Sequence, residues 1–220
     1  MSLRLRDNVH WCESGGRAIF LDIEADRYFC LPKSANDAFL RLANARMQPG
    51  DDERLGAVIA RGLLVECSAT NIIRRPPALE TPARDHAAAP QVGLLDLGRA
   101  LAAEMRAAKS LRSSPLRHAI AAASGLAPEW RPAPGASDRT VQTIVAASHA
   151  ISFLTRTHNR CLVRALAVHS TCKKRGISPK LVFGVIAHPF AAHCWVQLGN
   201  AVLVGGCEHA RLYSPILVIE

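Results

Sequence analysis

The sequence predicts an α+β protein with two domains. The first seventy residues hold short runs of β-branched and aromatic residues together with helical patterns, and the last 130 read as helices followed by strands. Between them, residues 68–92 are rich in proline and alanine and poor in large apolar groups. Burial cannot repay the ordering entropy of such a segment. We therefore expect a domain over residues 1–72, a linker over 73–92 and a second domain over 93–220.

The first domain is expected to contain a three-stranded meander and two helices. Runs at 9–11, 17–23 and 27–31 have strand composition and are separated by turn residues at 13–16 and 24–26. Ser34 is placed to cap a helix that ends near Leu42. A second helix is expected to begin at Asp51 and to end at Gly62, followed by a short strand over 63–66.

The second domain begins with helical patterns and ends with strand patterns. Helical spacing covers 94–112 and 115–124, and a proline-rich break follows at 128–135. Ser137 is placed to cap a helix over 138–157. The next helix is expected to begin at Cys161 and to end before Gly176, with cationic side chains in its last turn. From Pro179 onward the chain reads as strands.

Composition and charge limit the class of protein. Lys and Arg exceed Asp and Glu by 27 to 18, which gives a formal charge of +9 and favours an anionic partner. The basic residues are scattered and the chain has only two Tyr, so no nucleic-acid surface is expected. Seven cysteines, an odd number, suggest reduced thiols, and the N-terminus lacks a signal-peptide pattern, so we expect a cytoplasmic protein.

One long uncharged stretch raises the question of a membrane span. Residues 181–207 contain no Asp, Glu, Lys or Arg. Glycine, proline, histidine and amide residues interrupt the stretch at seven positions between Gly184 and Asn200, which suits buried strands better than a membrane helix. We expect no membrane span.

Cys161 and His193 form the pair with the clearest chemistry. Asn159 stands where a helix N-cap is expected, so Cys161 falls in the first helical turn, where unpaired amides favour a thiolate. His193 lies thirty-two residues later in a strand-like run and can serve as the base. The alternatives are a small buried cysteine and a core histidine. His188, before Pro189, fits the core role, and His158, His169 and His209 are weaker rivals for the base.

The third member of such a site is open in the sequence, because no Asp or Glu occurs between Asp138 and Glu208. A base usually needs a group that fixes its tautomer. The candidates are Glu208, Asn200, Gln197, Asp138 or a backbone carbonyl. The ligand-type residues near His193 and Cys207 lack the spacing of a closed zinc site, so we expect no metal and no cofactor.

The chain resembles the fused B proteins of lasso-peptide biosynthesis, in which a precursor-recognition domain precedes a leader peptidase of transglutaminase-like, papain-like cysteine-protease fold. The resemblance rests on four segments of the C-terminal half. They are Asn159-Arg-Cys-Leu-Val-Arg-Ala-Leu-Ala, Lys180-Leu-Val-Phe-Gly-Val, Ala192-His-Cys-Trp-Val-Gln and Tyr213-Ser-Pro-Ile-Leu-Val. The N-terminal part is similar to small winged-helix elements that hold leader peptides, through Phe20-Leu-Asp-Ile, Asp26-Arg-Tyr-Phe-Cys-Leu-Pro and Arg61-Gly-Leu-Leu.

The resemblance implies a reaction and two partners. The reaction is hydrolysis of the amide between the leader and the core of a ribosomally made precursor, with Cys161 as nucleophile and His193 as base. The partners are that precursor and a separate ATP-using, asparagine-synthetase-like cyclase. The family usually places an Asp where this chain has Gly205. A decayed peptidase that only binds leaders, and an acyltransferase that uses an amine in place of water, are the alternatives.

The expected leader site uses an edge strand and a nearby helix, because an extended peptide can add to a sheet edge while a helix supplies side-chain pockets. Each of these residues has a core role as its alternative. The candidates on the third strand and on the helix are Arg27, Tyr28, Phe29, Cys30, Leu31, Arg54, Leu55, Val58 and Ile59.

Overall fold

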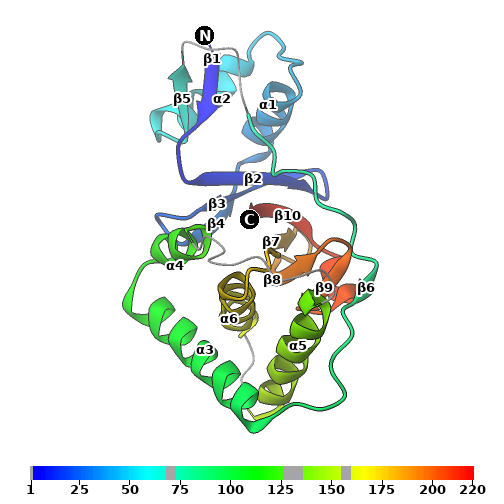
Figure 1. Ribbon diagram of the computed structural model, residues 1–220. Coiled ribbons are helices and arrows are strands. Elements are labelled where there is room, and N and C mark those ends of the chain that lie inside the picture. The colour runs from blue at the N-terminus through cyan, green and yellow to red at the C-terminus, as the bar shows by residue number, and fades with distance from the viewer. Residues whose placement is uncertain (1, 68–72, 126–135, 155–159) are drawn as a thin grey trace. The chain divides into compact units, whose positions relative to one another are not determined.

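The computed structural model describes residues 2–67, 73–125, 136–154 and 160–220, and it has a mixed α+β architecture (Figure 1). The chain divides into two compact units. One comprises residues 1–77, 185–191 and 214–217, and the other comprises residues 78–184, 192–213 and 218–220.

The first unit contains the meander that the sequence predicts. Strands β2 (Val9–Ser14), β3 (Arg17–Asp22) and β4 (Arg27–Cys30) form an antiparallel sheet in the order β2-β3-β4. The register pairs Trp11 with Phe20 and Phe20 with Phe29. Directly paired residues point to the same face, so these three aromatic side chains share one side of the sheet.

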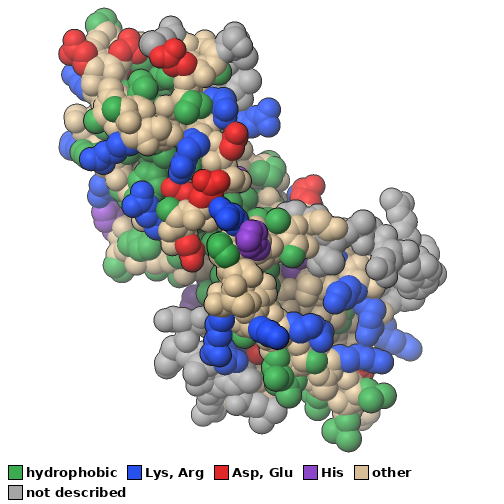
Figure 2. All heavy atoms as spheres, turned by 90° about the vertical axis from the view of Figure 1, so that its left-hand side faces the viewer, with side chains coloured by type: hydrophobic (Ala, Val, Ile, Leu, Met, Phe, Trp, Pro, Cys, Tyr) green, Lys and Arg blue, Asp and Glu red, His purple; other side chains and the backbone are tan. Residues whose placement is uncertain are grey.

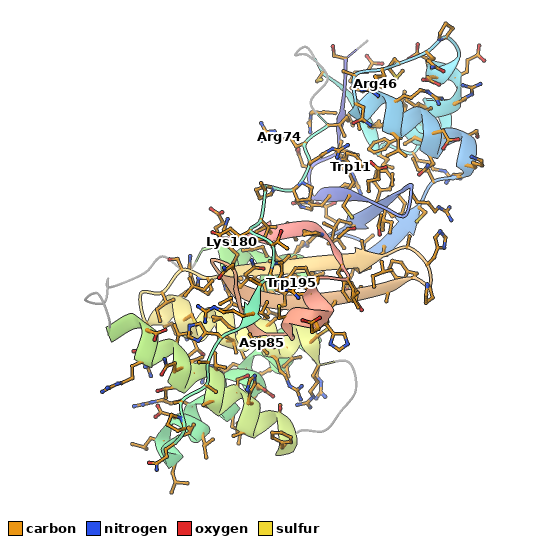
Figure 3. All side chains as sticks on the ribbon, turned by 90° about the vertical axis from the view of Figure 1, so that its right-hand side faces the viewer. Trp11, Arg46, Arg74, Asp85, Lys180 and Trp195 are labelled. Atoms are coloured by element: carbon orange, nitrogen blue, oxygen red, sulfur yellow. The ribbon has the colours of Figure 1, made fainter. Side chains whose placement is uncertain are left out.

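Two helices and a second strand pair complete this unit. They are α1 (Lys33–Ala43), α2 (Asp51–Ala60), β1 (Ser2–Leu5) and β5 (Leu64–Cys67), with β1 and β5 antiparallel. In the core of this unit the ring of Phe39, on α1, packs against the rings of Trp11 and Phe20. The centroid distances are 4.9 Å to Trp11 and 4.8 Å to Phe20. The Trp11 indole donates to the carbonyl of Arg74 over 3.0 Å (Figure 3). The sequence reading missed β1, whose partner lies some sixty residues away.

A buried carboxylate joins α1 to α2. Asp51 accepts hydrogen bonds from Arg41 Nε at 2.8 Å and from Arg54 at 3.1 Å, and its side chain is fully buried. The hydrogen bonds from Arg41 are the largest cause that holds the pKa of Asp51 far below its usual range. Ser34 is not the cap that the sequence suggests, because α1 begins at Lys33 after Pro32, whose fixed φ suits a helix start.

The second unit has helices α3 (Leu94–Ser113), α4 (Leu116–Ser124), α5 (Ala136–Leu154) and α6 (Cys161–Lys174), with α3, α5 and α6 packed together. The five-stranded sheet has the order β10-β7-β8-β9-β6. Its strands are β6 (Arg84–Asp85), β7 (Lys180–Ile186), β8 (Ala191–Leu198), β9 (Ala201–Val204) and β10 (Ser214–Ile219), and α7 (Cys207–Ala210) precedes β10. Helices α5 and α6 contact β9 (Figure 1).

Residues 80–86, which lie in the predicted linker, run along the edge of this sheet. Strand β6 pairs in parallel with β9, and the carbonyl of Glu80 accepts a 2.6 Å hydrogen bond from Gln197. Asp85, labelled in Figure 3, accepts a 2.7 Å hydrogen bond from the backbone of Cys207. The segment is held by backbone pairing, which does not require large apolar side chains.

Several expectations concern positions outside the described residues. The proposed N-cap Asn159 and the rival histidine His158 are among them, as are the last three residues of the helix predicted over 138–157. Among the described residues Arg160 is the residue that precedes α6, and its side chain makes no capping hydrogen bond. The side chain of Ser137, the other predicted cap, is likewise not described.

Two searches of the described residues bear on membranes and metals. None of the described helices combines the length and apolar character needed to cross a membrane. No group of three or more His, Cys, Asp or Glu side chains that could hold a metal occurs in the described ranges. Over the helices of the second unit, Figure 2 shows Lys and Arg side chains interspersed with apolar ones. Exposed apolar side chains of α3 include Leu94, Leu95 and Met105.

Candidate active site

Cys161 lies at the first position of α6 and lines a cavity of about 490 Å³. It is a free thiol with partial exposure. Burial raises the pKa of Cys172 to about 12, and it raises the pKa of Cys194 well above the usual value. Those two thiols are inert at neutral pH, because the thiolate is the nucleophilic form. Its lining residues within the described ranges are Ser148, His149, Ser152, Arg160, Cys161, Arg164, Ala192, His193, Val204 and Gly205.

His193 projects from the beginning of β8 and lines the same cavity. Its Nε2 lies 2.9 Å from the carbonyl oxygen of Gly205. A carbonyl oxygen only accepts hydrogen bonds, so Nε2 carries the proton in this contact. The neutral ring then keeps a lone pair on Nδ1. This tautomer is the one that a base needs if Nδ1 is to take a proton from a thiol.

The surroundings of His193 favour its neutral form. Burial lowers its pKa from the ordinary value, and the hydrogen bond to Gly205 opposes this only in part. The ring lies 5.2 Å from Tyr213 and 6.1 Å from Trp195, measured between centroids. His209 is a third ring neighbour, at 6.0 Å. These contacts fix the position of a ring that can accept a proton at neutral pH.

Gly205 occupies the position where the resemblance implies an Asp. Its φ is +112°, in the region that favours glycine, and a Cβ built there would lie 2.5 Å from Cβ of Trp195. A side chain at this position would therefore collide with β8. The backbone carbonyl of this same residue is the group that contacts His193.

Three of the other candidates for the third group have partners elsewhere, and the fourth, Asn200, is exposed in the turn before β9. Glu208 forms an ion pair with Arg211 at 3.0 Å, its side chain is 86% exposed, and it does not line the cavity. Gln197 is fully buried and accepts a hydrogen bond from the indole of Trp195. Asp138 lies 3.3 Å from His86. Among the described contacts of His193, the carbonyl of Gly205 is the one suited to orient the ring.

Two arginines of the cavity were missed by the sequence reading. Arg160 precedes Cys161, and Arg164 follows it by one turn of α6. The buried carboxylate of Glu104, on α3, lies 4.0 Å from Arg160 and 3.8 Å from Arg164. Arg164 also donates to the carbonyl of Ser152 over 3.3 Å. The i, i+3 relation to Cys161 was a sequence signal for Arg164, whereas nothing local pointed to Glu104.

The expected leader-binding residues separate into exposed and buried groups. β4 is an edge strand, with Arg27 and Cys30 exposed and Tyr28 and Phe29 partly exposed. Helix α2 packs against α1 and β5. Arg54 is partly exposed and pairs with Asp51, and Ile59 is partly buried. The remaining candidates are core residues: Leu31, Leu55 and Val58.

Residues 101–218 match the profile of the transglutaminase-like superfamily. The match covers more than half of the chain and includes Cys161, His193 and Gly205. The protein belongs to the transglutaminase-like superfamily. No curated protein and no solved structure matches the chain.

Proposed function

We propose that the protein is a cysteine peptidase that hydrolyses an amide bond through a thioester on Cys161. The observation that carries the proposal is the common cavity of Cys161 and His193, in which His193 has a fixed tautomer and a lowered pKa. Membership in a superfamily with cysteine peptidases and acyltransferases supports it. The superfamily and the cavity together are consistent with acyl transfer through a cysteine.

The proposed reaction has two steps. His193 takes the thiol proton, Cys161 Sγ bonds to the substrate carbonyl carbon, and the C–N bond breaks while His193 gives the proton to the leaving amine. His193 then takes a proton from water, whose oxygen displaces the thiolate and releases the acid. The carbonyl of Gly205 positions His193 throughout. It carries no charge, so we expect it to stabilise the imidazolium less than a carboxylate would.

We further propose a substrate for this peptidase, a ribosomally made lasso-peptide precursor. In this proposal the first unit binds the leader, and the second unit cuts the amide between leader and core before a cyclase closes the ring. The support is the resemblance of the four C-terminal segments and the exposed edge of β4 in the first unit. Buried Leu31, Leu55 and Val58 would support the fold of the binding unit, and the exposed residues of β4 would contact the leader.

Two alternatives share the same site. A leader-binding scaffold without activity was suggested by the missing Asp, but the Gly205 contact supplies an orienting group for His193. An acyltransferase would pass the acyl group from Cys161 to an amine in place of water. Product analysis distinguishes these, because hydrolysis adds the mass of water and amine transfer adds the amine.

The test is mass spectrometry of a leader–core precursor incubated with the full-length protein. We expect two fragments whose masses sum to the precursor plus water, and we expect Cys161→Ala to abolish cleavage with an unchanged circular dichroism spectrum. Cys67→Ala is the matched control, because Cys67 is a partly exposed thiol of β5. Full cleavage by Cys161→Ala would refute the proposal.

A further inference from the structure

We propose that the cavity beside Cys161 contains a subsite for a carboxylate of the substrate, formed by Arg160 and Arg164. This inference deepens the proposed function and rests on Cys161 as its nucleophile. The chemistry recognised is a carboxylate close to the bond that is cleaved, either an acidic side chain or the terminal carboxylate of a short peptide.

The position of the two guanidinium groups is the first support. Arg160 is adjacent to Cys161 and Arg164 is one helical turn beyond it, so both lie at the beginning of α6 and both line the cavity. Their side chains are 31% and 24% exposed. The two cations are thus partly removed from water and still accessible from the cavity, where an ion pair is stronger than on an open surface.

The charge balance is the second support. Among the described residues that line the cavity there is no Asp or Glu. Glu104, 4% exposed, is a carboxylate that lies within 4.0 Å of both arginines. In this described group of three, one carboxylate against two guanidinium groups leaves one net positive charge. Arginine presents a planar fork of donors that suits a carboxylate, so a substrate carboxylate would complete the group.

Glu104 also explains why the two arginines form a defined site. It projects from α3, whereas both arginines belong to the α6 region. A second tie joins α6 to α5, through the hydrogen bond from Arg164 to the carbonyl of Ser152. Three helices therefore hold the guanidinium groups beside the nucleophile, which limits the entropy lost when a substrate binds.

The experiment measures alkylation of Cys161 in the full-length protein by two small reagents of similar size. Iodoacetate is an anion and iodoacetamide is neutral, and both form a thioether with loss of iodide. Peptide mapping by mass spectrometry gives both rates at Cys161 and at the exposed Cys30, which serves as internal reference. Because both reagents react with the thiolate, the ratio of the two rates does not depend on the fraction of thiolate. The ratio therefore reports how strongly the anionic reagent is attracted to the site.

Three variants give the expected pattern. We expect Arg164→Gln to lower the iodoacetate-to-iodoacetamide ratio at Cys161 roughly threefold to tenfold, because one nearby positive charge is removed. Glu104→Gln should raise the ratio, because it removes the opposing charge. Lys174→Gln is the matched control: it removes a charge from an exposed position in the last turn of the same helix and should leave the ratio unchanged.

The opposite signs separate attraction from a general structural effect. A ratio that stays constant in Arg164→Gln, or that moves in the same direction in Glu104→Gln, would overturn the subsite. If Arg164→Gln fails to fold, Arg160→Gln carries the same expectation and is tested in its place. Selective alkylation of Cys161 without a charge preference refutes the subsite alone, whereas precursor cleavage by Cys161→Ala refutes the proposed function.

A second experiment distinguishes an acidic side chain from a terminal carboxylate as the recognised group. It measures how far short peptides slow the alkylation of Cys161 by iodoacetamide. The protectants are glutamyl and glutaminyl dipeptides at millimolar concentration, each with a free or an amidated C-terminus. Stronger protection by the amidated glutamyl peptide than by the amidated glutaminyl peptide identifies an acidic side chain. Protection that depends only on the free terminus identifies the terminal carboxylate. Equal protection by all four peptides, or none, contradicts the proposal.

Discussion

At the residue scale, the backbone carbonyl of Gly205 contacts His193 at the position where the resemblance implies an Asp side chain. The resemblance implies an Asp at this position, and the sequence left five groups open as the partner of the histidine. The structure places the carbonyl of Gly205 at 2.9 Å from His193 Nε2. Its φ of +112° and the proximity of Trp195 both require glycine.

We therefore expect that Gly205→Ala damages both stability and activity. The strained φ and the 2.5 Å approach to Trp195 together should cost about 2–4 kcal/mol of unfolding free energy. Urea denaturation gives this value, and the precursor assay gives the activity. In the matched control Gly206→Ala, φ is also positive but the nearest atom is 3.6 Å away, so only about 1–2 kcal/mol should be lost. Equal losses in the two variants would contradict the steric explanation.

At the scale of elements, the segment that contains β6 is part of the five-stranded sheet. The 2.7 Å hydrogen bond from the Cys207 amide to Asp85 satisfies an otherwise unpaired donor at the beginning of α7. The residue before α7 is Gly206, which has no side chain to make this contact. Asp85 thus caps a helix from a strand more than a hundred residues away in the chain.

Asp85→Ala should lower the unfolding free energy by about 1 kcal/mol, the usual effect of losing a capping side chain. Hydrogen exchange should also be faster at the Cys207 amide. Arg84→Ala is the matched control, because Arg84 is the exposed neighbour in the same strand. A stability loss that is the same in both variants would show that disturbance of β6 itself, and not the cap, is responsible.

At the scale of the whole molecule, the buried His169 links stability to pH. His169 lies on α6 with no exposed surface. Burial, reinforced by repulsion from Lys173, lowers its pKa from 6.5 to about 4. The neutral form is therefore favoured by folding. Its contribution to stability is complete above pH 6.5 and is lost as the pH falls from 6.5 to 4.

We expect the free energy of unfolding to fall by about 3 kcal/mol over this pH range, because each unit of difference between the folded and unfolded pKa of His169 corresponds to about 1.36 kcal/mol. Urea denaturation between pH 7 and pH 4.5, followed by circular dichroism, measures it. His169→Gln should remove most of the difference between the two pH values, and His118→Gln, at an exposed position of α4, should leave it unchanged. A His169→Gln protein with the wild-type pH dependence would show that His169 is not the responsible group.

The order of elements was accessible to sequence reasoning because it depends on local patterns. Runs of β-branched and aromatic residues separated by turn residues gave the meander in the first unit, and helical spacing together with capping and terminating residues gave α3 to α6. Strands β1 and β6 were missed, since the first is four residues long and the second is two. Both are fixed by pairing with distant strands, β5 and β9. Helix α2 was found, but its neighbours were not, because packing partners are not encoded in the periodicity of one segment.

The sequence by itself determined the chemistry that the chain can offer: a thiol at the beginning of a helix, a histidine in a strand, no carboxylate between Asp138 and Glu208, and a glycine at position 205. Only the tertiary structure decided which groups meet. It brought His193 to the Gly205 carbonyl and Glu104 to Arg160 and Arg164. These contacts join elements far apart in the chain. Their geometry depends on the packing of α3, α5 and α6 with one another and of α5 and α6 against β9, which no local pattern specifies.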